Sequence, residues 1–529
     1  MSGALQRHLT RSAEVDELAP AVALGDDVWR YGRLERVSNQ LSRLLRDVGC
    51  EAGERVVLAM SKSPAAIAAM HGVLKADGVY VPLDVASPPQ RVARILRQAA
   101  PTVLLADAAS FGLVEALADL GALDGVHIGS LDALGDVARR VRPRFGPDDL
   151  EAQAADAPPA RRGGDDVAHI LFTSGSTGVP KGVAITHANV EAFLAWALPY
   201  FGIERGERIS GHPPLHFDLS TFDIYGAMAA GAYLHLVPSH ANVIPRALAA
   251  FIAEARLSQW FSVPSALGYL VQHDAIAHGA FPDLRRVLWC GEAMPTPTLM
   301  ALMERLPHAR FTNLYGPTEA TIASSFHTVA SPPRSRSESV PIGLPCAGEE
   351  LWLLGDDLAA TPPGEVGQLY IGGVGLSPGY WRDEAKTAEA FLPHPFDATP
   401  GARIYRTGDL GRRDSEGRFY CLGRVDSQVK SRGYRIELGE IETALAALGT
   451  LEAVAVVAIV SDSFEGAVIC CAYVAADGID EVEVRTALGE HVPRYMLPTR
   501  WLRLDVLPVN ANGKVDRPAL RRRFEEARA

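Results

Sequence analysis

The ten residues Thr173–Gly182, TSGSTGVPKG, combine hydroxyl side chains, glycines and one lysine directly after the apolar run His169–Phe172. The apolar run is typical of a buried strand. Glycines let the backbone approach an anion closely, and hydroxyls with successive N–H groups can surround phosphate oxygens. The loop is not a Walker A loop, because Pro180 precedes Lys181 and Gly182 replaces the metal-binding hydroxyl. We expect a phosphate loop of another kind; the alternative is a flexible surface linker.

Length, charge and cysteine content limit the class of protein. A chain of 529 residues exceeds what one core supports, so two or more domains are expected. The net charge of −12 argues against nucleic acid or an anionic membrane as the main partner. With no apolar signal core and no stretch that approaches a membrane span, we expect a cytoplasmic location. The six cysteines form no C-x-x-C pair, and adjacent Cys470 and Cys471 are expected to be buried free thiols.

The first part of the chain alternates helical and strand patterns, which is typical of α/β layers. Leu34–Val48 and Pro64–Lys75 are predicted to be helices, and Arg55–Ala59 between them is predicted to be a strand. The polar segments Gly146–Asp166 and Ser331–Ser339 are predicted to be loops.

The composition changes near Arg424, and a small α+β unit of about one hundred residues is expected beyond it. We therefore expect domains at 1–423 and 424–529, with the boundary in Gly423–Asp426. The predicted strands of the small unit are Thr450–Ile459 and Gly466–Val474, and its predicted helices are Ile436–Leu448 and Val482–His491.

Seven further motifs follow one another along nearly the whole chain: LKADGVYVPLD, FDLSTFDIYG, NLYGPTEAT, GQLYIGGVGLSPGYW, YRTGDL, GRVDSQVKSRGYRIELGEIE and NGKVDR. Together with TSGSTGVPKG they resemble the adenylate-forming superfamily of acyl-CoA synthetases, luciferases and amino-acid adenylation domains of nonribosomal peptide assembly. The resemblance implies an α/β fold. It comprises a large multi-subdomain N-terminal domain, with α/β layers and a small β-barrel-like part, and a small, mobile C-terminal α+β domain.

The resemblance also implies the first half of a reaction with ATP. A carboxylate attacks the α-phosphate to give an acyl-adenylate and pyrophosphate, and fixed cations and backbone donors must meet the charge that develops. Lys181 is implied to add a cation to the phosphate loop, and Glu319 to bind Mg²⁺. Asp409 is implied to accept hydrogen bonds from the ribose hydroxyls. The structural alternatives are a helix N-terminal acid for Glu319 and a turn-capping residue for Asp409.

The adenine slot implied by the resemblance consists of Gly291, Glu292, Ala293, Asn313 and Tyr315, although Tyr315 could be ordinary core. The complete set of implied ATP- and AMP-binding residues is Thr173, Ser174, Gly175, Ser176, Thr177, Gly178, Gly291, Glu292, Ala293, Asn313, Tyr315, Gly316, Thr318, Asp409 and Arg424.

Lys514 matches the family's C-terminal catalytic lysine, which bridges the substrate carboxylate and the α-phosphate. Outside that context, a lysine near a chain end is ordinary solvated surface. The resemblance implies that the small domain swings about a hinge at Asp426. After adenylation this motion withdraws Lys514 and brings Gly433–Glu442 over a tunnel for a thiol. Gly433 would line that tunnel, although it could be a simple turn glycine.

Asp218 in FDLS matches the aspartate that pairs with the substrate ammonium in amino-acid adenylation domains. A buried carboxylate without a cation is costly, and the alternative is a capping residue before Ser220. The matched pocket walls are neutral and several are bulky, so we expect a small neutral amino acid: alanine first, then serine or glycine. Proline and a short β-amino acid compete, and the resemblance to D-alanine–carrier protein ligases supports a small substrate. The walls are Leu219, Phe222, Ser265, Leu288, Cys290, Leu314, Ile322 and Ala323.

No carrier-type segment with a phosphopantetheine serine follows Lys514, so we expect a free-standing ligase that loads a discrete acyl or peptidyl carrier protein. An acidic carrier would need a local basic patch, for which Lys430, Arg432 and Arg435 are candidates; the alternative is that they are merely solvated or structural.

Three other functions remain open. An acyl-CoA synthetase is disfavoured by Asp218 and by the lack of a recognisable basic nucleotide-binding cluster. A luciferase-like oxidase is not excluded. An inactive binding protein is disfavoured because Lys181, Glu319, Asp409 and Lys514 are all present.

Overall fold

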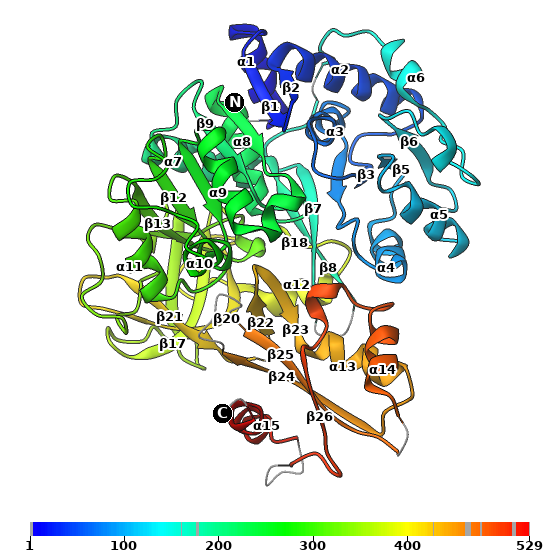
Figure 1. Cartoon of the computed structure of the whole chain (residues 1–529). Helices are drawn as coiled ribbons and strands as arrows, with labels where there is room; N and C mark the ends of the chain where they lie inside the picture. Colours follow the sequence, from blue (N-terminus) through cyan, green and yellow to red (C-terminus); the bar gives the residue numbers. More distant parts are fainter. Residues whose placement is uncertain are drawn as a thin grey trace.

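The computed structural model describes residues 4–159, 161–175, 179–426, 428–460, 467–476, 479–509 and 515–527. Its large N-terminal part is built on two mainly parallel sheets with helices packed on and between them (Figure 1). The first sheet has seven strands in the order β18-β8-β7-β4-β3-β5-β6. In that order they are Gly379–Tyr380, Lys181–Thr186, Val167–Thr173, Val79–Pro82, Arg55–Ala59, Val103–Ala106 and His127–Ser130.

The second sheet has nine strands in the order β15-β14-β13-β12-β11-β9-β10-β1-β2. In that order they are Leu344–Pro345, Ser325–Val329, Arg310–Tyr315, Arg286–Trp289, Gln259–Ser262, Arg208–Gly211, Tyr233–Leu236, Pro20–Leu24 and Asp27–Arg30.

The helices of the large part begin where short polar residues or prolines favour a helix start. Ser63 accepts a hydrogen bond from the backbone N–H of Ala66 ahead of α3, and Thr186 and Asn189 form a capping box at the start of α7. The helices are α1 (Gln6–Val15), α2 (Tyr31–Asp47), α3 (Pro64–Lys75), α4 (Pro89–Ala99), α5 (Phe111–Asp119), α6 (Pro147–Glu151), α7 (His187–Phe201), α8 (Leu219–Ala230), α9 (Pro245–Glu254), α10 (Pro264–Gln272), α11 (Thr296–Arg305) and α12 (Glu384–Ala390).

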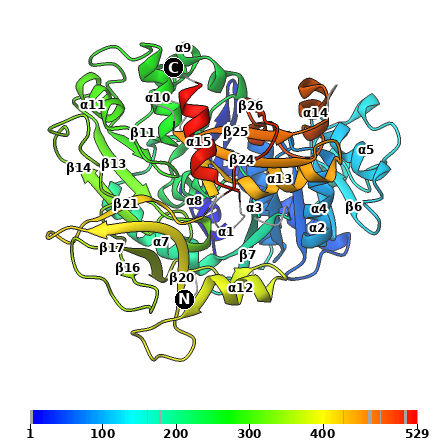
Figure 2. The same ribbon diagram turned by 90° about the horizontal axis from the view of Figure 1, so that it is seen from below.

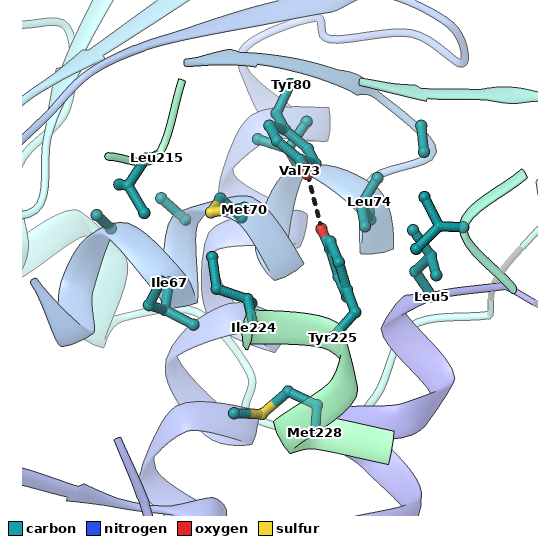
Figure 3. Close-up of a cluster of buried hydrophobic side chains, with 14 of the residues drawn as sticks. Leu5, Ile67, Met70, Val73, Leu74, Tyr80, Leu215, Ile224, Tyr225 and Met228 are labelled. Carbon is teal, nitrogen blue, oxygen red and sulfur yellow. Dashed lines mark hydrogen bonds between the residues drawn. The ribbon is translucent and has the colours of Figure 1, made fainter. Parts of the chain in front are cut away.

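The main hydrophobic core lies between the two sheets, where α3 of the first faces α8 of the second (Figure 3). Apolar side chains of both helices, such as Met70 and Ile224, fill the interface. The buried hydroxyl of Tyr225 donates to that of Tyr80 at 3.1 Å. Because α8 begins directly after Asp218, this packing fixes the position of the candidate substrate anchor.

A five-stranded antiparallel sheet follows in the chain, in the order β16-β17-β20-β19 with β21 beside β20. Its strands are β16 (Glu349–Leu354), β17 (Val366–Gly373), β20 (Arg403–Arg413), β19 (Phe391–Pro393) and β21 (Phe419–Arg424). This sheet corresponds to the small barrel-like part of the expected fold, and it carries Asp409 and Arg424 as directly paired residues of β20 and β21.

The C-terminal part is a small α+β domain, seen most clearly in Figure 2. A two-stranded hairpin of β22 (Gln428–Ser431) and β23 (Tyr434–Glu437) precedes a three-stranded sheet. The sheet consists of β24 (Ala453–Val460), β25 (Ala467–Val474) and β26 (Arg500–Arg503), with α13 (Leu438–Ala447), α14 (Glu481–Leu488) and α15 (Arg517–Glu526) around it. The predicted boundary falls on the link between β21 and β22, and its role as a domain boundary stays a prediction.

Most predicted elements are confirmed, and the errors have local causes. The strand Arg55–Ala59 and the helix Pro64–Lys75 have the predicted bounds. The helix predicted from Ile436 begins at Leu438 because Ile436 pairs with Val429 in the hairpin. The segment Gly146–Asp166 is not entirely loop, because Pro147 and the Asp149 side chain, which accepts from the Gly146 N–H, start the short helix α6.

All six cysteines are free, and Cys470 and Cys471 are buried as predicted. Within the described ranges, no helix combines the length and the apolar character needed to cross a membrane. The cytoplasmic location stays a prediction.

Candidate active site

A cavity of about 120 Å³ lies where the large part meets the β22–β23 hairpin of the small domain. The large part contributes the ends of several strands and the start of α8, and the small domain closes the other side. The predicted site residues that line the cavity are Thr173, Ser174, Asp218, Leu219, Gly291, Gly316, Thr318, Asp409, Arg424 and Gly433. Residues from five motifs that are distant in the sequence therefore converge on one cavity.

The phosphate-loop candidate connects two antiparallel strands, β7 and β8, in which Thr173 pairs with Lys181. A side chain at Gly175 would approach the carbonyl oxygen of Val179 to 2.0 Å, so only glycine fits there. The ammonium of Lys181 lies 5.5 Å from the ring centre of Tyr380. Ser176, Thr177 and Gly178 of this loop, and the catalytic-lysine candidate Lys514, lie outside the described residues.

Glu319 is fully buried and is held by a cation from the other domain. Arg435 of β23 donates from Nη1 to both carboxylate oxygens, at 2.9 and 2.7 Å, and the Tyr380 hydroxyl donates to Oε1 at 2.8 Å. Burial alone would raise the pKa of Glu319, but the Arg435 charge and the Tyr380 hydrogen bond outweigh it and hold the pKa below its usual value. The carboxylate is therefore ionised and paired in this domain arrangement.

Arg424 pairs both with Asp409, the candidate ribose-binding residue, and with Asp426, the candidate hinge residue. Its Nη1 donates to Oδ1 of Asp409 at 2.7 Å, and its Nε and Nη2 donate to the two oxygens of Asp426, both at 2.7 Å. The Tyr315 hydroxyl donates to the other oxygen of Asp409. Asp409 lies inside strand β20, so it does not act as the turn cap that was its alternative.

The adenine candidates do not all face the cavity. Gly291 lines it with a backbone φ of +91°, whereas Ala293 is exposed. Glu292 spans the two domains, because its carboxylate accepts the Ser265 and Gly433 backbone N–H groups at 3.1 and 2.7 Å. The side-chain nitrogen of Asn313 donates to the Pro341 carbonyl at 2.7 Å. Its use in binding adenine stays a prediction.

Asp218 stands at the N-cap position of α8 and makes no side-chain capping bond there. The carboxylate is buried and faces the cavity. Burial raises its pKa to about 6, while Thr318 and the charge of Lys430 act in the opposite direction. A buried carboxylate of this kind is suited to a cationic group that arrives with a ligand.

The predicted pocket walls pack behind Asp218. Of the eight, only Leu219 borders the open cavity. The Phe222 ring contacts Phe193 and Phe261 edge-on, and burial raises the pKa of the Cys290 thiol to about 12, so this wall stays uncharged. Ile322 has a φ of +68°, a strained backbone for a β-branched residue, as is common at binding sites. The walls within the one core cluster are Leu219, Phe222, Leu288, Cys290, Leu314, Ile322 and Ala323.

The predicted basic docking patch is wrong for two of its three members. Arg435 forms an ion pair with Glu319. Lys430 lines the cavity, and its ammonium lies 5.5 Å from the centre of the Tyr315 ring. Strand alternation in β22 and β23 turns these side chains toward the large part, whereas Arg432 in the turn is exposed.

Some site residues were missed from the sequence. Arg91, His216 and Tyr495 line the cavity, and Tyr434 stacks on Tyr495 at 3.6 Å between ring centres. His216 could have been found from its place beside the FDLS motif. Arg91 and Tyr495 gave no local signal, because their position depends on how the domains meet.

The fold combines a large α/β part with a small α+β domain, and the cavity with the buried carboxylate of Asp218 lies where the two meet. The AMP-binding enzyme family matches residues 9–381, and the AMP-binding enzyme C-terminal domain matches residues 440–514. The chain therefore belongs to the AMP-binding enzymes, the adenylate-forming superfamily, whose members use ATP.

Individual relatives agree with this assignment over nearly their whole length. An L-proline–[L-prolyl-carrier protein] ligase of Streptomyces coelicolor is 37% identical over 521 residues, covering 96% of this chain and 94% of the relative. A ligase of the same name from Pseudomonas fluorescens is 35% identical, covering 99% and 98%. The adenylation domain AlmE of Vibrio cholerae, solved with glycyl-adenosine-5'-phosphate, superposes with a TM-score of 0.86 at 25% identity, covering 99% and 98%.

Proposed function

We propose that this enzyme adenylates a small neutral amino acid with ATP and passes it to the phosphopantetheine thiol of a discrete carrier protein. The observation that carries the proposal is the position of Asp218. Its carboxylate is buried, makes no side-chain capping bond to α8, and faces the cavity that Asp409 and Gly433 also line. A substrate ammonium supplies the missing counter-charge. Two relatives that match over nearly their whole length are named as amino-acid–carrier protein ligases. Their names support both an amino acid as the substrate and a carrier protein as the acceptor.

In adenylation, we assign Asp409 to the ribose and Lys181 with its loop to the phosphates. Glu319 fits a magnesium ion, since a hard cation prefers carboxylate and phosphate oxygens, but only after Arg435 leaves it. No group of three or more His, Cys, Asp or Glu side chains within the described ranges could hold a metal, so Glu319 would share the ion with ATP. The bound ion would neutralise phosphate charge. Lys514 is assigned to the developing charge at the α-phosphate.

We assign the domain arrangement described above to the transfer step. Arg435 occupies the carboxylate of Glu319, and the Ser174 hydroxyl donates to the backbone oxygen of Arg435 at 2.6 Å. Both contacts place the small domain on groups that adenylation needs for metal and phosphate. A Cβ atom at Gly433 would lie 2.5 Å from Val263, so glycine is required for this close approach. Adenylation then requires a swing about Asp426.

The walls support a substrate with few side-chain atoms. Phe222 and Leu288 are at most 1% exposed and leave little space behind Asp218. Alanine fits this slot first, followed by serine and glycine. Proline is the second candidate, because two relatives with matches over nearly the whole chain are named as proline ligases, and its ring adds little depth.

Loading of a carrier tests this proposal directly. A phosphopantetheinylated carrier protein is incubated with enzyme, ATP and alanine or proline, and its intact mass is measured. The expected result is a gain equal to the aminoacyl group. Acylation of free coenzyme A alone, with every carrier tested left unchanged, would replace this proposal with an acyl-CoA synthetase.

A further inference from the structure

His216 is a side chain of the active-site cavity to which the proposed function assigns no role. It lies two residues before Asp218, on the segment that connects β9 to α8. This segment is fixed where it leaves β9, because the Lys62 ammonium donates to the carbonyl oxygens of Gly211 and His212 at 2.7 and 2.9 Å. The imidazole is therefore carried on an anchored segment beside the candidate substrate anchor.

The imidazole lies where the small domain closes the cavity. His216 is half-buried, and its ring packs against that of Phe217 at 5.1 Å between ring centres. Phe217 in turn packs edge-on against Tyr434 of β23 at 5.0 Å, and Tyr434 stacks on Tyr495. All four side chains line the cavity. His216 therefore belongs to the part of the cavity that forms in the domain arrangement assigned to transfer.

The imidazole of His216 is not used by the fold. Its Nε2 is buried and has no hydrogen-bond partner among the described residues. Burial lowers the pKa of His216; the charge of Asp84, after β4, opposes this effect, and the charge of Arg91 on α4 adds to it. The ring is therefore neutral at pH 7, and a neutral imidazole has one nitrogen that can accept a proton. An unpaired polar group in a cavity is available to a ligand.

No other described side chain of the cavity is available as a base at neutral pH. The three arginines and the lysine that line the cavity are cations. Asp409 already accepts two side-chain hydrogen bonds, and Asp218 is assigned to the substrate ammonium. Burial raises the pKa of Tyr434 to about 12 and also raises that of Tyr495, so both phenols keep their protons. Among these groups, His216 alone combines a neutral state with a free proton-accepting nitrogen.

We propose that His216 is the general base of the transfer step, an inference that rests on the proposed function. A thiol is mostly protonated at neutral pH, whereas the thiolate is the nucleophile. The imidazole accepts the proton of the phosphopantetheine thiol as the sulfur forms a bond to the carbonyl carbon of the aminoacyl-adenylate. The bond between that carbon and the phosphate oxygen then breaks, and its electron pair leaves with AMP. The imidazolium returns its proton to solvent.

Two small thiols of equal length and different acidity test this role. Single-turnover transfer from aminoacyl-adenylate formed in situ is compared at pH 8 for ethanethiol and for trifluoroethanethiol, whose fluorine atoms make it ionise more readily. His216→Gln should lose about 100-fold with ethanethiol, as expected for removal of a general base. The loss should be much smaller with the fluorinated thiol, which needs less help to ionise. The exposed His278→Gln is the matched control and should keep the wild-type rates with both thiols.

The wild type gives a second measurement that does not depend on the folding of a variant. With a neutral base in the cavity, transfer to ethanethiol should stay level between pH 7 and 9. Attack by thiolate formed in solution would instead rise steeply over this range, as more of the thiol ionises. Such a rise in the wild type would overturn the proposal.

The remaining outcomes separate this inference from the proposed function. Equal losses with both thiols in H216Q would show a structural role, and unchanged rates would show that His216 takes no proton; each overturns the proposal. Pyrophosphate exchange is measured with the same wild-type preparation. Absence of exchange with every amino acid would refute the proposed function itself, whereas exchange without the expected thiol dependence would refute only the role of His216.

Discussion

Arg435 of the small domain donates from one nitrogen to both carboxylate oxygens of Glu319 in the large part, at 2.9 and 2.7 Å. The contact joins residues 116 positions apart and holds the β22–β23 hairpin against the large part. Under the proposed function, one carboxylate alternates between a magnesium ion and a guanidinium. The pair then ties the position of the small domain to the stage of the reaction.

Arg435→Ala should impair transfer more than adenylation. Removing one partner leaves the buried Glu319 charge uncompensated in the transfer arrangement only, so carrier loading should fall by about tenfold or more. Amino-acid-dependent pyrophosphate exchange should persist. Arg522→Ala, an exposed change on α15 of the same domain, is the control. Equal losses in loading and exchange would contradict the assignment of this contact to transfer.

Lys514→Ala should have the opposite effect. Loss of a cation at the α-phosphate should slow adenylation by about 100- to 1000-fold. Transfer from supplied aminoacyl-adenylate should survive, since the lysine is withdrawn by then. Single-turnover assays of each half-reaction measure both effects. If transfer fell as far as adenylation, the two-arrangement account would be wrong.

The pH dependence of kcat/KM for the amino acid should reflect the ionisation of the Asp218 carboxylate. Its carboxylate must be ionised to pair with an ammonium, and burial raises its pKa to about 6. The value of kcat/KM for the amino acid should therefore fall as the pH drops below about 6, whereas an ordinary aspartate stays ionised to about pH 4. A pH profile of exchange with no decline between pH 7 and 5 would contradict the anchor role.

The same group should affect stability in the free enzyme. Since its pKa is raised on folding, the stability it provides is present at low pH and is lost as the pH rises from about 4 to 6. Asp218→Asn should then increase Tm at pH 8 while sharply raising the amino-acid concentration needed for exchange.

Phe222→Ala should enlarge the substrate slot and destabilise the fold. The ring is 1% exposed and contacts Phe193 and Phe261, so its loss should cost about 3–5 kcal/mol. Preference should move from alanine toward valine or leucine by about tenfold, as expected for added methylene groups. Thermal melting and exchange kinetics check the two effects. A lower Tm with unchanged preference would place Phe222 in the core only.

The sequence predicted what is local. Strand β3 and helix α3 follow from hydrophobic periodicity and from Ser63 and Pro64 at the helix start, so their bounds agreed. The motifs also gathered Asp218, Asp409 and Gly433 around one cavity. Asp218 directly precedes α8, Asp409 lies within β20, and Gly433 lies in the turn between β22 and β23.

What depends on contact between domains could not be predicted. Arg435 looked like a docking residue because its partner lies more than one hundred positions away. Arg91 of α4 pairs with Glu440 of α13, which lies 349 positions further along the chain. No periodicity within one segment encodes such pairs.

The most direct test of the account is amino-acid-dependent pyrophosphate exchange measured across the proteinogenic amino acids. We predict the highest kcat/KM for alanine, serine, glycine or proline, with phenylalanine, glutamate and lysine near background, and a sharp loss in Asp218→Asn. Strong exchange with a bulky or charged amino acid would contradict the shallow neutral slot. Exchange only with carboxylic acids that lack an amino group would contradict the central claim that Asp218 selects an amino acid.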